Sequence, residues 1–561
     1  MHTSLRSIGF SFALVGTAFA VLASGPRASG QGASPSQASG SARFVCESAT
    51  RIADPRLAGG GASFGIGLAP ADARAEVTAD VLADGKLVEH LWSGTLSGRA
   101  GTHKLGWDGR DASGMRCATG HYALRLSGRG VETLELPLDL VRLGVTEIEA
   151  QDSRPGTHDE FQMVYFKKGA EYAFFATPAI HEYVNHAAEG ELSDLDLDDG
   201  EPRPAALVHN DTASPVLAGA DYATARYNYP LAYVQGASPL LELTFGASAT
   251  DAARQAMSVG YPVPGFELRV ACDGGVAGSE PVLPGGTAHV RLARLPLGVG
   301  RTDLTLVLRF QSRALGETSW SAIPGELAIP LRIYRLLGPP LFREGALGAQ
   351  YAGPWVEVAE DLARWNQSLE LDTSDQRGLI DAFVHGFFGQ NGGIPTAIEG
   401  VVYDAFPLGG DGGATHYVTP QGAMNLSRLL DGHALGRFVN CTDNMGATTT
   451  MLSMLGAKNM RPLRLGHMNL RAIWGIGAPG YTLNLWGNSP HAFSYHHIVT
   501  DDDGESVSDT CMQLDEDGAP QALPGRPGWN VRRPWAGAGG YMNLAANNNV
   551  SKHVETLPSL R

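Results

Sequence analysis

Residues 101–122 read GTHKLGWDGRDASGMRCATGHY. An extended run ends in Trp107-Asp108-Gly109-Arg110-Asp111, a tight turn containing Gly114 follows, and Gly120-His121-Tyr122 opens the next extended run. Short strands separated by glycine-bearing turns are typical of β-sandwich proteins. We therefore predict a unit of short strands joined by tight turns around this stretch.

The flanking sequence extends this pattern toward the N-terminus. Polar and apolar residues alternate over 75–81, Asp84-Gly85 is a favoured hairpin turn, and 87–92 resumes an extended run. The Trp-Asp-Gly-Arg-Asp turn followed by Gly-x-Tyr resembles the Ig-like domain of flagellar hook-cap (FlgD-type) proteins. The resemblance implies a small β-sandwich over 44–135, used as a spacer or adhesive module, and fold analogy alone says nothing about chemistry.

Composition bounds the class of protein. The 561 residues include 42 Lys and Arg against 58 Asp and Glu, which gives a net charge of −16 and argues against nucleic-acid binding. Hydrophobic residues make up 43% and charged residues 18%, which suffices for buried cores. The length predicts three or four domains.

The N-terminus has the pattern of an export signal. His2 and Arg6 precede an uncharged apolar run from Ile8 to Leu22 that ends in small residues. We predict a signal peptide over 1–23, with an uncleaved anchor as the alternative, and a secreted, periplasmic or cell-surface protein. Residues 24–43 are mostly Ser, Gly, Ala, Gln and Pro and should form a flexible linker.

No other apolar run is long enough to span a membrane, since Leu327–Leu341 is interrupted by Arg332 and Arg335. We therefore expect no integral span after signal cleavage. The sequence contains no CxxC or HExxH motif, and the acidic run 193–201 lacks the glycine of a calcium loop, so no metal and no cofactor is predicted.

Five cysteines are too few for a disulfide scaffold, and their odd number leaves at least one unpaired. Cys46 and Cys117 lie at the edges of the predicted Ig-like unit. Because export favours oxidation, we expect these two cysteines to pair.

The pattern of predicted strands and helices changes after the Ig-like unit and again after Gly338-Pro339-Pro340. Residues 136–336 are strand-rich, with good strands at 240–245 and 303–310, and predict one or two further sandwich domains. Helical spacing at 355–371 and 379–388 then predicts an α+β domain over 337–561.

One constellation in this last region suggests catalysis. Asn440 or Thr442 can cap a helix, which would place Cys441 at a helix N-terminus, where the thiolate is stabilised. Residues 491–500 (HAFSYHHIVT) form an extended run, and after the turn 501–504 a partner strand carries Asp509. A histidine takes the thiol proton and a carboxylate orients the imidazole, so the order Cys, His, Asp suits nucleophilic catalysis.

This order resembles the catalytic core of the transglutaminase-like family, which belongs with the papain-type thiol enzymes. The family pattern is a Cys helix, a His-Ala-aromatic strand and an Asp on the following strand, and it matches Cys441, His491 and Asp509. The resemblance implies a thioester on Cys441, with His491 as base and acid and Asp509 orienting it. The expected function is that of an exported peptidase, amidase or crosslinking transferase acting on peptides or proteins, including cell-wall or surface components.

Several alternatives remain open at this point. Strand alternation puts His491 and His497 on one face and turns His496 away. A metal site from these two histidines and an Asp of the turn lacks any established ligand pattern. Trp365, Gln367 and Gln390 are the candidates for stabilising the oxyanion. The same fold without activity would make a binding or structural protein.

A second thiol is expected near the first. Asp509 and Cys511 are two apart on one strand and share a face. Cys511 is either a small buried hydrophobe or the partner of Cys441 in a reversible, inactivating disulfide.

Overall fold

The computed structural model describes most of residues 42–182 and 230–560. The longer stretches left out within 42–560 are 183–229, 246–265, 278–286, 342–353, 389–401, 405–413, 431–437, 476–490 and 514–531. The predicted signal peptide at 1–23, nearly all of the predicted linker at 24–43 and the acidic run 193–201 lie outside the described residues.

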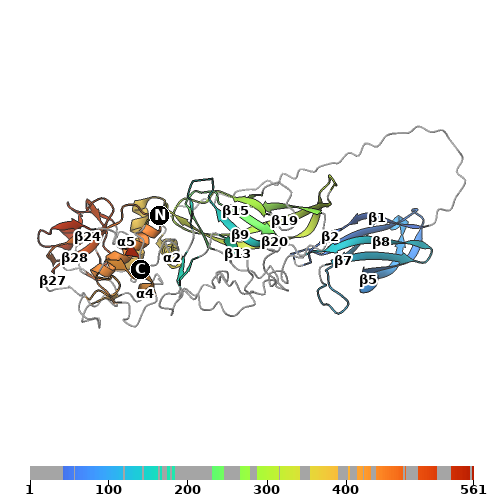
Figure 1. Cartoon of the computed structure of the whole chain (residues 1–561), viewed down its shortest axis with the longest axis horizontal. Helices are drawn as coiled ribbons and strands as arrows, with labels where there is room; N and C mark the ends of the chain where they lie inside the picture. Colours follow the sequence, from blue (N-terminus) through green and yellow to red (C-terminus); the bar gives the residue numbers. More distant parts are fainter. Residues whose placement is uncertain are drawn as a thin grey trace, which may run out of the picture. The chain divides into compact units, whose positions relative to one another are not determined.

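The first folded segment is a two-sheet β-sandwich, as predicted (Figure 1). One sheet has the order β1 (Arg43–Ala49), β3 (Ala62–Ala69), β6 (His103–Trp107). The other has the order β2 (Ile52–Ala53), β8 (Val131–Leu140), β7 (Gly120–Gly128), β4 (Arg74–Ala83), β5 (Lys86–Ser97). Phe64 and Leu105 of the first sheet and Val77 and Leu124 of the second share one buried cluster.

Two turns of this sandwich follow from local sequence. Asp84 and Gly85 both adopt positive φ, 48° and 74°, as the two-residue hairpin between β4 and β5 requires. In the second turn the Trp107 indole N–H donates to the carbonyl of Arg110 (2.7 Å), and Asp111 Oδ1 accepts the backbone N–H of Ser113 (2.9 Å) and Met115 (3.0 Å). Neighbouring residues therefore hold both turns.

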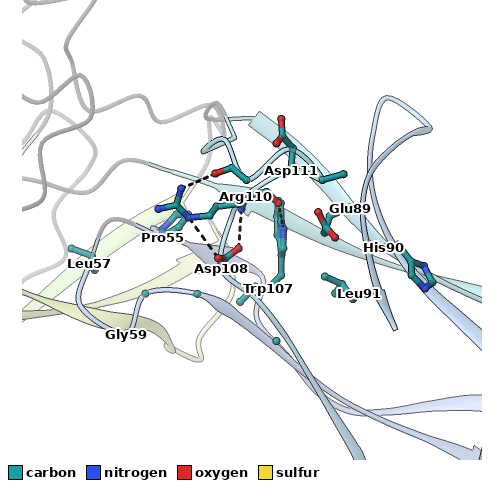
Figure 2. A pocket seen from close by; sticks show the side chains of 16 residues that line it. Pro55, Leu57, Gly59, Glu89, His90, Leu91, Trp107, Asp108, Arg110 and Asp111 are labelled. Atoms are coloured by element: carbon teal, nitrogen blue, oxygen red, sulfur yellow. Dashed lines mark hydrogen bonds and ion pairs between the residues drawn. The ribbon is translucent and has the colours of Figure 1, made fainter. Parts of the chain in front are cut away.

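An open hollow of about 840 Å³ lies beside the second turn (Figure 2). Arg110, on its wall, donates to the carbonyl of Gly114 (2.7 Å) and lies 3.6 Å from a carboxylate oxygen of Asp108. These charged side chains satisfy one another. The other titratable side chains that line the hollow are Glu89, His90 and Asp111.

The middle segment is a second two-sheet arrangement around one described core. The first sheet has the order β10 (Glu160–Phe161), β14 (Pro230–Val234), β20 (Ser321–Leu336), β19 (Gly300–Ala314), β16 (Phe266–Asp273). The second has the order β13 (Ile180–Glu182), β9 (Val145–Gln151), β15 (Leu240–Phe245), β18 (Thr287–Leu292), β17 (Gly275–Ala277). A separate hairpin pairs β11 (Val164–Phe166) with β12 (Phe174–Ala176). Leu308 and Leu331 of the first sheet pack with Leu241 and Val290 of the second.

The remaining segment combines helices with short strands around a third buried cluster. Its helices are α2 (Val356–Leu369), α3 (Gln376–Phe388), α4 (Leu426–Leu430), α5 (Cys441–Met454) and α6 (Tyr541–Ala545). A three-stranded antiparallel sheet has the order β28 (His496–Thr500), β24 (Arg461–Leu465), β32 (Lys552–Val554). The helices predicted at 355–371, at 379–388 and after Asn440 correspond to α2, α3 and α5.

Short two-stranded sheets surround this core. They pair β21 (Val402–Tyr403) with β23 (Phe438–Val439), β25 (Met468–Leu470) with β27 (His491–Phe493), β26 (Trp474–Gly475) with β30 (Met512–Gln513), β29 (Ser506–Val507) with β31 (Arg533–Pro534), and β22 (Ala423–Met424) with β33 (Ser559–Leu560). The described chain is thus mostly β-strand with few helices. Within it, no helix is both long and apolar enough to cross a bilayer.

The expected Cys46–Cys117 disulfide is wrong, because all five cysteines are free thiols. Cys46 lies on exposed strand β1 opposite Ile66. The Cys117 backbone N–H instead donates to the carbonyl of Gly109 (2.8 Å), and its thiol interacts with Tyr122. The two cysteines therefore belong to different local environments of the sandwich.

Candidate functional site

Cys441 is the first residue of α5, the position predicted from the sequence. Asn440 caps the helix: its Oδ1 accepts the Asp443 N–H (3.0 Å), and Asp443 Oδ2 accepts the Asn440 N–H (3.3 Å). The N–H groups of Cys441 and Thr442 have no partner within the helix, and they point out of its positive end. Cys441 therefore lies at the end of the helix where the exposed N–H groups favour negative charge.

Asp443 also holds a second segment, residues 416–418, against the N-terminal turn of α5. Its carboxylate accepts the backbone N–H groups of His416 (2.9 Å), Tyr417 (2.7 Å) and Val418 (3.0 Å). Burial raises the pKa of Asp443, and these hydrogen bonds oppose that effect. One buried carboxylate thus ties residues 416–418 to the first turn of α5, where Cys441 lies.

A buried ion pair lies beside this helix end. Nε2 of His496, on β28, is 2.9 Å from Oδ2 of Asp509, and both side chains are 0% exposed. The antiparallel bridge between Val499 and Ser508 brings the two residues together across the predicted hairpin. Asp509 Oδ1 accepts the N–H groups of Cys511 (2.7 Å) and Met512 (3.3 Å), so the carboxylate is held from both sides.

The surroundings of His496 keep it protonated. Burial lowers the pKa of His496, but the Asp509 carboxylate, together with the hydrogen bond and negative charge of Cys441, outweighs burial and raises this pKa to about 10. Its other ring nitrogen, Nδ1, is buried, and the Cys441 side chain is a hydrogen-bonding neighbour of the imidazole. The imidazolium therefore pairs with Asp509 through Nε2 and interacts with the neighbouring Cys441 thiol.

Two aromatic rings extend the site. Phe493 stacks on the His496 imidazole, with centroids 5.2 Å apart and planes at 22°, and also on Tyr403, at 6.4 Å and 24°. Burial raises the pKa of Tyr403 well above its usual value, and negative charge at Cys441 would reinforce that shift. Phe493, the aromatic residue of the His-Ala-aromatic motif, therefore covers one face of the imidazole.

The structure brings Cys441 and Asp509 to one site, but the histidine bonded to Asp509 is His496. His491 lies on β27, where its backbone pairs with Leu470, and its side chain is outside what the structure describes. The expected continuous strand is wrong: β27 ends at Phe493, the chain bends at Ser494, and β28 begins at His496. Alternation counted from His491 is reset at this bend.

The pairing across the hairpin predicts the histidine that faces Asp509 better than counting from His491 does. Because Val499 lies opposite Ser508, Ile498 lies opposite Asp509, and residues 496, 498 and 500 share the face of Asp509. Counting back from the turn would have indicated His496. His497 instead faces Thr442 Oγ1, 3.0 Å from its Nδ1, and Glu555, 3.4 Å from its Nε2.

Cys511 lies under the first turn of α5. Its Sγ accepts a hydrogen bond from Asn444 Nδ2 (2.9 Å) and lies 4.0 Å from the carbonyl oxygen of Asn440. Burial raises the pKa of Cys511, and neighbouring Asp509 and Cys441 add to the effect, so Cys511 remains a thiol. Asp509 and Cys511 are connected by a bend, not by the predicted strand, yet Cys511 does face the Cys441 helix.

Of the three residues predicted to stabilise the oxyanion, the structure describes the side chain of Trp365 alone. Trp365 packs edge-on against Phe383 (5.4 Å) and Phe387 (6.5 Å), within the core between α2 and α3. The side chains of Gln367 and Gln390 lie outside the described residues. In the part of the chain that the structure describes, no group of three or more His, Cys, Asp and Glu residues is arranged to hold a metal ion.

Sequence missed Tyr541, which lies on α6 and donates a hydrogen bond to Asp509 Oδ2 (2.8 Å). The residue is 32 positions from Asp509 and sits in no recognisable motif. Only the packing of α6 brings the two together.

Comparison with known proteins bears on the first sandwich. Residues 53–130 match the family model of the FlgD Ig-like domain, within the segment 44–135 for which the sequence predicted that resemblance. No curated protein matches the chain. Residues 53–130 are therefore similar to the Ig-like domain of the FlgD family.

Proposed function

We propose that residues 337–561 form a transglutaminase-like thiol domain in which Cys441 is the nucleophile, His496 the base and acid, and Asp509 the orienting carboxylate. The observation that carries this proposal is the 2.9 Å contact between His496 Nε2 and Asp509 Oδ2 beside the N-terminus of α5. Taking two charges out of water costs free energy. A buried pair next to a thiol at a helix end is suited to catalysis.

The groups present support acyl transfer from a peptide or carboxamide bond. The Cys441 thiolate attacks the carbonyl carbon, and the backbone N–H groups of the first turn of α5 face the developing oxyanion. The C–N bond breaks as protonated His496 gives its proton to the leaving amine, which leaves a thioester on Cys441. Neutral His496 then takes a proton from water or an amine, which attacks the thioester and releases the acyl group.

Water as acceptor makes the protein a peptidase or amidase, and an amine makes it a crosslinking transferase. With the predicted signal peptide at 1–23, the substrates would be peptides or proteins outside the cytoplasm. The FlgD-type module would then act as a spacer between the export signal and the thiol domain. The competing proposal is a surface protein that binds peptide through the same fold without reacting.

Thiol reactivity separates these two proposals. The full chain is treated with iodoacetamide at pH 7, and alkylation of each cysteine is followed by peptide mass spectrometry. Cys46 is exposed and serves as the internal reference for a solvent-accessible thiol. We expect Cys441 to react roughly tenfold or more faster than Cys46, because a helix N-terminus and an adjacent histidine activate a thiol as a nucleophile.

Two variants test the assignment of the base. His496→Gln should bring the Cys441 rate down to that of Cys46, whereas His491→Gln should leave it unchanged. Equal rates for Cys441 and Cys46 in the wild type would overturn the catalytic proposal. A loss in His491→Gln together with no loss in His496→Gln would overturn the assignment of the base.

A further inference from the structure

We propose that Tyr541 is a positioning residue of the thiol site, acting on His496 through the carboxylate of Asp509. The inference rests on the proposed function, and it concerns a residue from the C-terminal part of the chain that no motif connects with the triad. Tyr541 acts on the site through its hydrogen bond to Asp509. Its role is to set the orientation and the charge of the group that holds the base.

Tyr541 and His496 converge on the same oxygen. The Tyr541 hydroxyl donates to Asp509 Oδ2 at 2.8 Å, and His496 Nε2 lies 2.9 Å from that atom. The opposite oxygen, Oδ1, accepts the two backbone N–H groups of Cys511 and Met512. With both oxygens occupied, the carboxylate cannot rotate without breaking a buried hydrogen bond.

Toward the ionised Asp509 carboxylate the hydroxyl can only donate. Burial raises the pKa of Tyr541 well above its usual value, and the Asp509 charge adds to this effect, so the phenol keeps its proton. A neutral donor on Oδ2 draws negative charge from the carboxylate and weakens its attraction for the imidazolium. Tyr541 therefore moderates the pKa of His496 as well as fixing its partner.

The tyrosine ring is itself held in place. It is fully buried and stacks on Trp535, with centroids 6.0 Å apart and planes at 14°, and Lys552 Nζ lies 5.0 Å from the centroid of Trp535. The Met542 N–H donates to the carbonyl of Trp535 (3.2 Å), which fixes the start of α6. A phenylalanine at position 541 would keep this stacking and lose only the hydroxyl.

Other titratable groups act on the same pair and stay in place in such a variant. They are Cys441 of α5, Cys511 after Asp509, Tyr403 of β21 and His497 of β28, whose own pKa is lowered first by burial and also by the charge of His496. A change in the titration of His496 in Tyr541→Phe therefore reports the missing hydroxyl.

The test measures the titration of His496 in Tyr541→Phe and in the wild type. Nitrogen-15-labelled histidine in the full chain gives the pKa of His496 by NMR, with His496→Gln identifying its signals. Removing the donor leaves a more basic carboxylate, so we expect the pKa of His496 to rise by roughly 0.5 to 1 unit. The rate of Cys441 alkylation, plotted against pH, should also change at its alkaline end. The pH of that inflection should rise by the same amount as the pKa of His496.

Tyr233→Phe is the matched control. The Tyr233 hydroxyl is also buried, and it donates to the carbonyls of Gln151 (2.9 Å) and Leu240 (3.1 Å) in the middle sandwich. This variant should cost comparable stability and leave the pKa of His496 unchanged. If Tyr541→Phe also leaves it unchanged, or if Tyr233→Phe shifts it equally, the positioning role is overturned.

The two proposals fail separately in this experiment. A shifted pKa of His496 in Tyr541→Phe, with Cys441 no more reactive than Cys46 in the wild type, would support the coupling and overturn catalysis. A reactive Cys441 with an unshifted pKa would support catalysis and overturn the role of Tyr541.

Discussion

The ring of Phe493 lies face to face with the imidazole of His496, with centroids 5.2 Å apart and planes at 22°. The other contacts of this ring include Tyr403, at 6.4 Å. Stacking on Phe493 therefore restrains the plane of the imidazole ring, and the contact with Asp509 restrains the direction in which its Nε2 points. Substitutions at Phe493 can separate these two constraints.

Phe493→Leu should slow alkylation of Cys441. An aromatic pair contributes about 1 kcal/mol beyond its buried area, so loss of the stack should lower the rate roughly fivefold through misorientation of His496. Phe493→Trp keeps a stacking ring and should retain most of the rate. The contrary outcome is a Phe493→Leu protein with the wild-type alkylation rate; Phe64→Leu, in the Ig-like core, controls for general destabilisation.

The cap of α5 should matter for stability. Asn440→Ala removes the acceptor for the Asp443 N–H and should cost about 1 kcal/mol, whereas Asn440→Ser restores an acceptor and should cost much less. Asp443→Ala removes the acceptor of several N–H groups and should cost about 2–4 kcal/mol. Thermal unfolding checks this order, and equal midpoints for Asn440→Ala and Asn440→Ser would contradict it.

Stability should fall on the alkaline side because of His496. The folded pKa of about 10 lies above the ordinary value of 6.5, so protonated His496 stabilises the fold fully below about pH 6.5. Its contribution is lost as the pH rises toward 10, with a slope of up to about 1.4 kcal/mol per pH unit. Urea unfolding at a series of pH values measures this slope. His496→Gln should lack that component, and identical slopes in both proteins would refute the shift.

Cys511 makes the site a candidate for reversible oxidation. Oxidised glutathione can accept the two electrons and release two glutathione thiols as Cys441 and Cys511 join. Peptide mapping of the oxidised wild type should then find a Cys441–Cys511 bridge that dithiothreitol reverses. In Cys511→Ser the same treatment should give only a glutathione adduct on Cys441. An adduct without any bridge in the wild type would rule the internal disulfide out.

A buried charge cluster fastens α2 to the middle sandwich. Glu360 accepts from Arg332 (2.9 Å) and Arg301 (2.9 Å) and from the hydroxyl of Tyr334. Glu360→Gln leaves the buried Arg332 with a weaker partner and should cost about 3 kcal/mol.

The double variant Arg332→Met/Glu360→Leu replaces both charges by apolar side chains and should recover most of that loss. Thermal unfolding of both variants gives the comparison. A double variant no more stable than Glu360→Gln would show that the charges themselves are needed.

Local sequence was sufficient wherever the deciding contacts span a few residues. Asn440 and Asp443 are three positions apart, so the cap, and with it the place of Cys441, could be predicted. Asp84 and Gly85 specify their hairpin by backbone conformation alone. In the turn after Trp107, the side-chain contacts made by Trp107 and Asp111 join residues at most four apart. The motif of this turn lies within the residues that match the FlgD Ig-like family model.

The tertiary structure decided which histidine faces the carboxylate and what else holds it. Strand alternation is reliable only within an unbroken strand, and the bend at Ser494 between β27 and β28 changes the face on which each later residue lies. Asp509 therefore meets His496, and Tyr541 reaches the same oxygen from α6. Such contacts depend on how separate elements pack against one another, and no spacing within a single element records them.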